Sequence, residues 1–337
     1  MYMSTIIQRQ KKLLSIKNLT ICLHTRHGDI FPVQNISCGI EEHEIIGIVG
    51  ESGSGKSVFA LSLAHLLPEE MVHIEADEIK FSNYDLKNLS KREWQTIRGA
   101  MISYVFQDSL VALNPHLTVG YQLTEPLQIH YKYPSEKSKQ IAIEYLKAVQ
   151  IPDPELQMKR YPHHLSGGMR QRIAIAMALI LKPKLLIADE PTTALDATLQ
   201  AQILDLFKKL HEEKPFTMII ITHDLSLVAG LCHRVWIMYA GKILETAPVD
   251  QLFQNPLHPY THALLSLKRN IGSRKRLQSL PGKPPDLKTL VERCPFAERC
   301  PYAVEKCYAQ PITTTEMEPL HSTTCLRVIN HEIELKA

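Results

Sequence analysis

The sequence predicts an α/β protein with a helical insertion and a separate C-terminal extension. The continuous apolar run "IIGIVG" at Ile45–Gly50 is typical of a strand buried on both faces. It leads through a glycine-rich turn into "SVFALSLAHLL" at Ser57–Leu67, which predicts a helix. A strand, a glycine loop and a helix in this order open an α/β unit.

The remaining elements of the core follow from short apolar or β-rich segments. Two such segments precede the glycine loop, at Leu13–Leu23 and Phe31–Ile40. Four further strands are predicted at Met101–Phe106, Leu185–Asp189, Thr217–Thr222 and Val235–Ala240.

The stretch Leu110–Pro162 interrupts this pattern with prolines and an amphipathic helix, "SEKSKQIAIEYLKAVQ". Apolar residues fall on one face of that helix: Ile141, Tyr145, Leu146 and Val149. We therefore expect a helical subdomain at about residues 110–180.

Composition excludes several classes of protein. The chain has 337 residues with 38 Lys+Arg against 35 Asp+Glu, and a net charge of +3 is too small to indicate nucleic acid as the main partner. The N-terminus has no signal-peptide pattern, and no apolar run approaches the roughly 20 residues of a spanning helix. We expect a protein soluble by itself, whose membrane role would come through a partner.

Cysteine usage indicates a reducing compartment. Seven cysteines, an odd number without a secretion signal, argue against a disulfide framework. Cys22, Cys38 and Cys232 are scattered and are predicted to be buried small hydrophobes.

The strongest local motif is "GESGSGKS", which fits the phosphate-binding pattern G-x-x-x-x-G-K-[ST] between a strand and a helix. Backbone N–H groups of such a loop surround phosphate oxygens, and the helix N-terminus favours anions. Lys56 would reach the β- and γ-phosphates, and the Ser57 hydroxyl would bind Mg²⁺. The predicted ATP-binding residues of the loop are Gly50, Glu51, Ser52, Gly53, Ser54, Gly55, Lys56 and Ser57.

The second motif is "LLIADEP", a predicted buried strand that ends in two acids. Asp189 at the strand tip would hold Mg²⁺ and contribute to the ATP site. Glu190 would deprotonate the attacking water as general base.

The third motif is "LSGGMRQR" at Leu165–Arg172. Ser166 can cap the following helix, and Gly167 and Gly168 leave its N-terminus open to an anion. From this stretch alone, a simply capped helix is an equal interpretation.

The ordered set "GESGSGKS", "VFQD", "LSGGMRQR", "LLIADEPTTALD" and "ITHD" resembles the nucleotide-binding subunit of an ABC transporter over about residues 13–250. The resemblance implies a P-loop NTPase core of the RecA-like type with an N-terminal antiparallel β subdomain. It also implies a nucleotide-binding domain at 1–254 and a C-terminal extension at 255–337.

The resemblance assigns further roles. Gln107 would sense Mg²⁺ and the attacking water, and His223 would contact the γ-phosphate. Ser166, Gly167 and Gly168 would contact ATP held by an opposite subunit. A loop coupling the two sites would contain Ala194, Leu195 and Asp196.

The adenine-stacking residue is left between His27 and Phe31. His27 has the expected spacing to Lys56 but would stack more weakly than tyrosine. Phe31 is equally consistent with a core position.

The tail narrows the resemblance. "NPLHPYT", "SLPGKPPDL" and "RCPFAERCPYA" resemble the branch of di- and oligopeptide permeases that also includes nickel uptake systems. This resemblance implies three kinds of partner: two membrane permease subunits, a second homologous ATP-binding subunit and, indirectly, an extracytoplasmic solute-binding protein. A heterodimer of ATPases at the cytoplasmic face of the inner membrane is expected, with a homodimer as the alternative.

The rival class comprises ABC ATPases that act on nucleic acid or ribosomes. These usually carry a long coiled coil or tandem nucleotide domains, and the sequence predicts neither. We therefore expect no nucleic-acid partner. The one contrary feature is the basic run at 268–276, for which a solvated linker is an equal explanation.

Four cysteines in the tail have the spacing C-x5-C-x6-C-x17-C: Cys294, Cys300, Cys307 and Cys325. The gaps are wider than the close pairs of structural zinc sites, and four thiolates suit a [4Fe–4S] cluster. Zinc is the first alternative, and four unligated thiols are the second. The resemblance supports the cluster. Because the tail has few large apolar residues to form a core of its own, a bound metal would stabilise its fold. His321 is expected at the surface.

Overall fold

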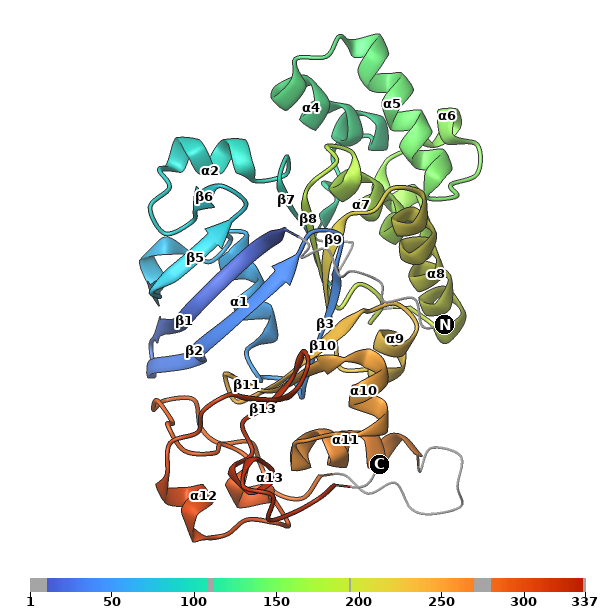
Figure 1. Cartoon of the computed structure of the whole chain (residues 1–337). Coiled ribbons are helices and arrows are strands. Elements are labelled where there is room, and N and C mark those ends of the chain that lie inside the picture. Colours follow the sequence, from blue (N-terminus) through green and yellow to red (C-terminus); the bar gives the residue numbers. More distant parts are fainter. Residues whose placement is uncertain (1–10, 108–111, 194, 270–279, 336–337) are drawn as a thin grey trace, which may run out of the picture. The chain divides into compact units, whose positions relative to one another are not determined.

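The computed structural model describes residues 11–107, 112–193, 195–269 and 280–335 (Figure 1). The chain divides into two compact units. Unit 1 contains the described parts of Met1–Lys17, Ser37–Glu44 and Ala76–Ile219. Unit 2 contains Asn18–Ile36, Ile45–Glu75 and the described parts of Ile220–Ala337.

Unit 1 has antiparallel and parallel strand pairs. The start of β1 (Lys12–Thr25) pairs antiparallel with β5 (Glu78–Phe81), and β5 pairs with β6 (Tyr84–Asp85). A parallel pair joins β7 (Ile102–Val105) to β8 (Leu185–Asp189). Every residue of β8 is buried, as its uninterrupted apolar sequence predicts.

Some helices of unit 1 begin at side-chain caps. The helix α2 (Lys91–Ile97) starts with a capping box between Ser90 and Glu93, and α4 (Val119–Tyr131) starts at Thr118. The further helices are α5 (Ser135–Ala148), α6 (Pro154–Gln157), the 3₁₀ turn η2 (Pro162–His164), α7 (Gly167–Leu179) and α8 (Ala197–Glu213).

The helices α4, α5 and α7 contact one another, and α4, α5 and α6 group together in the green part of the ribbon (Figure 1). The predicted apolar face of α5 is confirmed in part: Leu146 and Val149, the residue after the helix, are fully buried, whereas Ile141 and Tyr145 are half-buried. The predicted helical insertion is therefore confirmed, although residues 108–111 at its start lie outside the described ranges.

Unit 2 contains a five-strand run in the order β12–β13–β11–β10–β3. The central parallel pair is β3 (Ile45–Val49) with β10 (Arg234–Tyr239). Antiparallel pairs then add β11 (Lys242–Pro248), β13 (His321–Thr323) and β12 (Thr315–Glu318). The tail thus extends the sheet, which the sequence does not predict.

Other strands of unit 2 are β4 (Val72–Glu75), which pairs antiparallel with the end of β1, and part of β2 (Gly28–Glu41). The strand β9 (Thr217–Thr222) has the predicted bounds and is buried throughout. The helical elements are α1 (Lys56–Leu63), η1 (Glu69–Met71), α9 (Leu225–Ala229), α10 (Val249–Gln254), α11 (Pro259–Arg269), η3 (Ala297–Arg299), α12 (Glu305–Ala309) and α13 (Leu326–Ile329).

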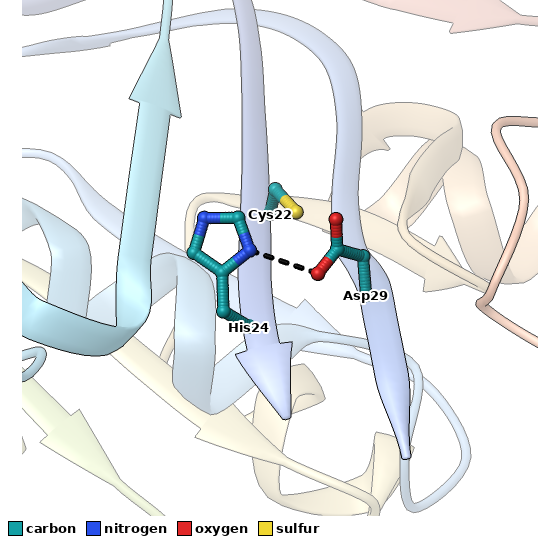
Figure 2. Close-up of side chains that lie close together, drawn as sticks. All are labelled: Cys22, His24 and Asp29. Carbon is teal, nitrogen blue, oxygen red and sulfur yellow. Dashed lines mark hydrogen bonds and ion pairs between the residues drawn. The ribbon is translucent and has the colours of Figure 1, made fainter. Parts of the chain in front are cut away.

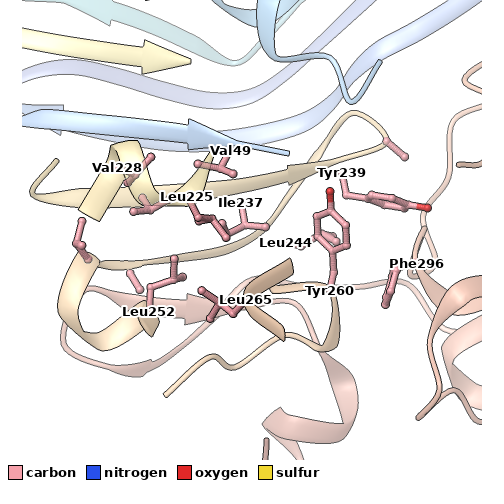
Figure 3. Packing of buried hydrophobic residues seen from close by; sticks show 14 residues of the cluster. Val49, Leu225, Val228, Ile237, Tyr239, Leu244, Leu252, Tyr260, Leu265 and Phe296 are labelled. Carbon is pink, nitrogen blue, oxygen red and sulfur yellow. The ribbon is translucent and has the colours of Figure 1, made fainter. Parts of the chain in front are cut away.

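The core of unit 2 combines strand and tail residues. Ile237 and Tyr239 of β10 pack in one cluster with two residues of the tail, the C-terminal extension at 255–337: Tyr260 of α11 and Phe296 (Figure 3). All four are at most 1% exposed. Burying an aromatic side chain contributes about 2–3 kcal/mol, so these residues fix the tail firmly.

The predicted fold class is confirmed: α/β, with antiparallel β strands near the N-terminus, a helical insertion and a cysteine-containing extension. The domain boundary at residues 254 and 255 stays a prediction. Within the described residues, no helix is both long and apolar enough to cross a membrane.

Candidate functional site

The glycine loop after β3 is shaped by two glycines that no other residue could replace without a shift. A Cβ on Gly50 would lie 2.0 Å from the carbonyl oxygen of Met238. A Cβ on Gly55 would lie 1.8 Å from the carbonyl oxygen of Pro32, and Gly55 also has a φ of 99°. The loop can therefore curl only with glycine at both positions.

Lys56 lies inside this curl. It is buried, and its Nζ donates to the carbonyl oxygens of Gly50 and Glu51, both at 2.8 Å. Ser57 is exposed in the first turn of α1, which begins directly after the loop. The loop thus places an ammonium group and a helix N-terminus together, which suits a phosphate group.

The acidic strand end lies in unit 1. Asp189 is buried and accepts a hydrogen bond of 2.9 Å from the Tyr104 hydroxyl. Burial and the Asp189 carboxylate raise the pKa of Tyr104. The phenol therefore stays protonated and donates a hydrogen bond to the carboxylate.

Glu190, the next residue, has a φ of 44°, in the left-handed region that a side chain of this kind rarely adopts. Its Oε2 accepts from Gln107 Nε2 at 3.2 Å and from Thr193 Oγ1 at 2.7 Å. Backbone strain of this kind concentrates at functional sites. The structure therefore brings the predicted Gln107 and Glu190 together.

The "LSGGMRQR" motif forms the predicted capped helix start. Ser166 Oγ accepts from the N–H of Met169 at 3.3 Å. Gly167 is exposed, and a Cβ there would have nothing within 4 Å. A Cβ on Gly168 would meet Leu199 at 3.2 Å, so Gly168 also allows close packing against α8.

The remaining predicted residues lie at element ends. His223 is exposed directly after β9, and the following Asp224 caps α9. Leu195 is half-buried, Asp196 caps α8, and Ala194 lies outside the described residues. The phosphate loop and His223 belong to unit 2, whereas Gln107, Asp189, Glu190 and the Ser166 turn belong to unit 1.

The two candidates for adenine stacking differ in exposure. His27 is exposed in the turn between β1 and β2, whereas Phe31 is half-buried in β2. The N–H of Phe31 donates to the carbonyl oxygen of Leu287 at 2.7 Å, so its backbone is tied to the tail. The choice between the two stays a prediction.

Three residues that contact predicted site residues are not predicted from the sequence: Tyr104, Thr193 and Arg299. Tyr104 and Thr193 lie beside recognised motifs, so their polar side chains are a signal that could have been used. Arg299 had no such signal, because it lies in the tail and meets the loop residue Glu51 only in the fold.

A phosphate loop after one buried strand, together with a second buried strand that ends in two acids, defines a nucleotide-binding ATPase. Comparison with known families gives two matches. Residues 33–193 match the ABC transporter family, and residues 244–307 match the oligopeptide/dipeptide transporter C-terminal region.

Curated relatives agree. The chain is 46% identical over 281 residues to the oligopeptide transport ATP-binding protein OppD of Bacillus subtilis, covering 83% of this chain and 78% of that one. It is 45% identical to the dipeptide transport ATP-binding protein DppD of the same organism, with 94% of each covered. The chain belongs to the ABC-type ATPases of the oligopeptide/dipeptide transporter family.

Solved structures support the same fold. A dimeric bacterial ABC transporter cassette, MJ0796, superposes with a TM-score of 0.62 at 31% identity, covering 70% of this chain and 98% of that one. A post-hydrolysis dimer of the same cassette, bound to ADP and Pi, matches with the same score at 30% identity.

The predicted metal site in the tail requires a correction. All four predicted ligands line one pocket, namely Cys294, Cys300, Cys307 and Cys325. However, no three of their sulfur atoms lie within 4.8 Å of one another in the described residues. The relatives are described as peptide transport ATP-binding proteins, with no cluster named. The iron–sulfur prediction is thereby contradicted, and nothing in this geometry supports zinc.

Burial also affects three of these thiols. Burial raises the pKa of Cys294 to about 12 and that of Cys300 to about 11, and it also raises the pKa of Cys325. The tail is fixed by the shared core around Tyr260 and Phe296.

His321 also differs from expectation. It is fully buried, and its Nε2 lies 2.8 Å from Oε1 of the equally buried Glu245. The sequence predicts a surface position for this residue. In the fold, β13 pairs with β11 and carries His321 inward.

The one group of three close metal-ligating side chains among the described residues lies elsewhere, on β1 and β2. Cys22, His24 and Asp29 approach one another there (Figure 2). His24 Nδ1 lies 2.8 Å from Asp29 Oδ1, and burial together with the Asp29 carboxylate raises the pKa of Cys22. These side chains interact with one another, so the pairing of the two strands explains the group.

Proposed function

We propose that this chain is the ATP-hydrolysing motor subunit of a membrane importer for di- or oligopeptides. The observation that carries the proposal is the presence, in one chain, of a phosphate loop and a match to the oligopeptide/dipeptide transporter C-terminal region. The names of the similar proteins support peptide transport over the nucleic-acid alternative.

In the proposed site, the glycine loop from Gly50 to Ser57 wraps the phosphates of ATP. Lys56 turns from the carbonyl oxygens of Gly50 and Glu51 towards the β- and γ-phosphates. The hydroxyl of Ser57, the carboxylate of Asp189 and the amide of Gln107 are suited to hold Mg²⁺, because hard oxygen donors are its preferred ligands. A bound Mg²⁺ would neutralise phosphate charge.

Hydrolysis requires a base and an oriented water. Glu190 is proposed as the general base, with Gln107 and Thr193 fixing the carboxylate through their hydrogen bonds. His223 is proposed to contact the γ-phosphate from the end of β9. Most of the rate enhancement would then come from positioning and charge stabilisation.

The start of α7 supplies a second anion site that one bound nucleotide does not need. Ser166, Gly167 and Gly168 are proposed to contact ATP held by a second ATPase subunit. Dimeric cassettes among the similar structures support this arrangement. We expect a homologous partner subunit, with a homodimer as the alternative.

The complete transporter would contain two membrane permease subunits above the ATPases, at the cytoplasmic face of the inner membrane. An extracytoplasmic solute-binding protein would deliver the peptide. Closure of the ATPase pair would drive the permeases, and hydrolysis would reset them.

Two experiments test this function. Affinity purification from membranes should recover two permeases and a second ATPase, whereas recovery of DNA or ribosomes would contradict the proposal. Uptake of labelled di- and tripeptides should be lost on deletion of the gene and restored by the wild-type chain. Lys56→Ala should fail to restore it.

A further inference from the structure

The second residue of the phosphate loop is bound by the C-terminal tail. Nη1 and Nη2 of Arg299 donate to the two carboxylate oxygens of Glu51, at 2.7 and 3.1 Å. Both residues belong to unit 2. This two-bond geometry matches the planar fork of a guanidinium to a carboxylate, the strongest form of side-chain ion pair.

The guanidinium of Arg299 is held by further hydrogen bonds. Besides Glu51, Nε donates to the carbonyl oxygen of Pro281 at 2.8 Å, Nη1 to the Tyr239 hydroxyl at 3.0 Å, and Nη2 to the carbonyl oxygen of Leu280 at 3.3 Å. A guanidinium has five N–H donors, and these five bonds use all of them. The side chain is only 5% exposed, and the bond to Glu51 raises the pKa of Arg299.

A second tail residue contacts the backbone of Glu51. The hydroxyl oxygen of Tyr260 accepts the N–H of Glu51 at 3.0 Å. The Tyr260 ring is fully buried and packs against Tyr239 and Phe296, with ring centroids 4.7 and 5.2 Å apart (Figure 3). The tail therefore fixes both the side chain and the N–H of one loop residue.

Within the loop, the carbonyl oxygen of Glu51 accepts from Lys56 Nζ at 2.8 Å and from the N–H of Ser54 at 3.2 Å. Once Lys56 turns to a phosphate, the Lys56 contact is lost. The contacts from Arg299 and Tyr260 do not depend on Lys56 and can persist. A binding loop that is already fixed in its bound shape loses less entropy when the ligand arrives.

We propose that Arg299 is a positioning residue for nucleotide binding: it fixes the phosphate loop through Glu51 and thereby lets the C-terminal tail set the affinity for ATP. The inference rests on the proposed ATP site and adds a function for the tail. Because coupling between two sites is reciprocal, bound ATP also stabilises the tail around Arg299.

The test compares ATP affinities in the full-length chain. Arg299→Lys keeps the charge but loses the fork, Arg299→Ala removes both, and Glu51→Gln removes the carboxylate charge. Arg293→Ala is the matched control, because Arg293 lies in the same segment and, among the described residues, forms its ion pair with the exposed Glu298 at 3.4 Å and lies over the Tyr308 ring, away from the loop. Titration with a fluorescent ATP analogue should show about tenfold weaker binding in the first three variants and unchanged binding in the control.

Two further readouts separate positioning from a merely structural role. In the assembled transporter, the KM for ATP should rise in Arg299→Lys while kcat changes little. Hydrogen exchange in the segment 293–309 should slow when ATP binds to the wild type, and this slowing should be weaker in Arg299→Lys. If Arg299→Ala does not fold, Arg299→Lys and Glu51→Gln decide the outcome.

Variants that bind ATP as tightly as the wild type would overturn the inference, even if their melting temperatures fall. That result would leave the proposed ATPase function standing. A wild-type chain that binds no nucleotide would instead overturn the proposed function, and this inference with it.

Discussion

At the scale of single residues, Glu190 shows how the fold surrounds the proposed base. Its left-handed backbone turns the chain sharply after the buried Asp189, and its carboxylate accepts from Gln107 and Thr193. Two adjacent acids thereby acquire different surroundings, one buried beside Tyr104 and one beside polar side chains that can orient it. Different environments for neighbouring carboxyl groups allow different chemical roles.

Replacing Glu190 by Gln should lower ATP hydrolysis by about 10²–10⁴-fold, the usual contribution of a general base. ATP binding should persist, since the phosphate loop is unchanged. Phosphate release and nucleotide titration measure the two effects. Glu213→Gln, which alters an exposed carboxyl at the end of α8, is the control. Wild-type hydrolysis by Glu190→Gln would exclude its role as base.

A second residue-scale prediction concerns pH. Complete burial lowers the pKa of His258 to about 3, and its Nδ1 accepts the N–H of Tyr260 at 3.1 Å. In the unfolded chain, His258 is protonated below about pH 6.5, whereas in the folded chain its imidazole stays neutral down to about pH 3. Stability should therefore fall as the pH drops through this window, by up to about 1.4 kcal/mol per pH unit.

The measurement is urea unfolding between pH 7 and pH 5. His258→Asn, whose side-chain oxygen can replace Nδ1 as acceptor, should show a shallower dependence on pH than the wild type. His331→Asn changes an exposed histidine and should leave the slope unchanged. Equal slopes in all three proteins would contradict the prediction.

At the scale of elements, the connection between β11 and α11 depends on one buried carboxylate. Oε1 and Oε2 of Glu245 accept the N–H groups of Leu257 and His258, each at 2.8 Å, and Oε1 also meets His321 Nε2. These contacts join β11, the start of α11 and β13. The proline-rich tail is thus ordered around a polar centre as well as around Tyr260 and Phe296.

Glu245→Ala should destabilise the protein by about 3–5 kcal/mol, because three buried donors lose their acceptor. Chemical denaturation measures the loss. Glu305→Ala, at an exposed position in the first turn of α12, should change stability little. Comparable stability of Glu245→Ala and the control would show that the buried network is not needed.

At the scale of the whole molecule, the chain carries the two features proposed for a composite ATP site: a phosphate loop and an open, capped helix start. Similar cassettes form dimers. A chain that offers both halves is expected to hydrolyse ATP only when paired.

Gly167→Arg should therefore abolish ATP-dependent pairing without unfolding the chain, since a Cβ at Gly167 meets nothing within 4 Å. Gly230→Arg is the matched control, as Gly230 is equally open. Light scattering of each variant in the Glu190→Gln background with ATP, alone and with the co-purified partner ATPase, measures pairing. Pairing of Gly167→Arg would exclude α7 from the interface.

By itself, the sequence determined the class of fold, the phosphate loop and the acidic strand end. These features are local: an apolar run encodes a buried strand, and fixed glycine positions encode a loop shape. It could not show that Tyr260 and Arg299 contact the phosphate loop, or that His321 is buried against Glu245. Such contacts join residues far apart in the chain, so only tertiary packing decides them. For the same reason, the cysteine spacing gave a wrong metal site. Spacing along the chain does not fix the distances between sulfur atoms in the fold.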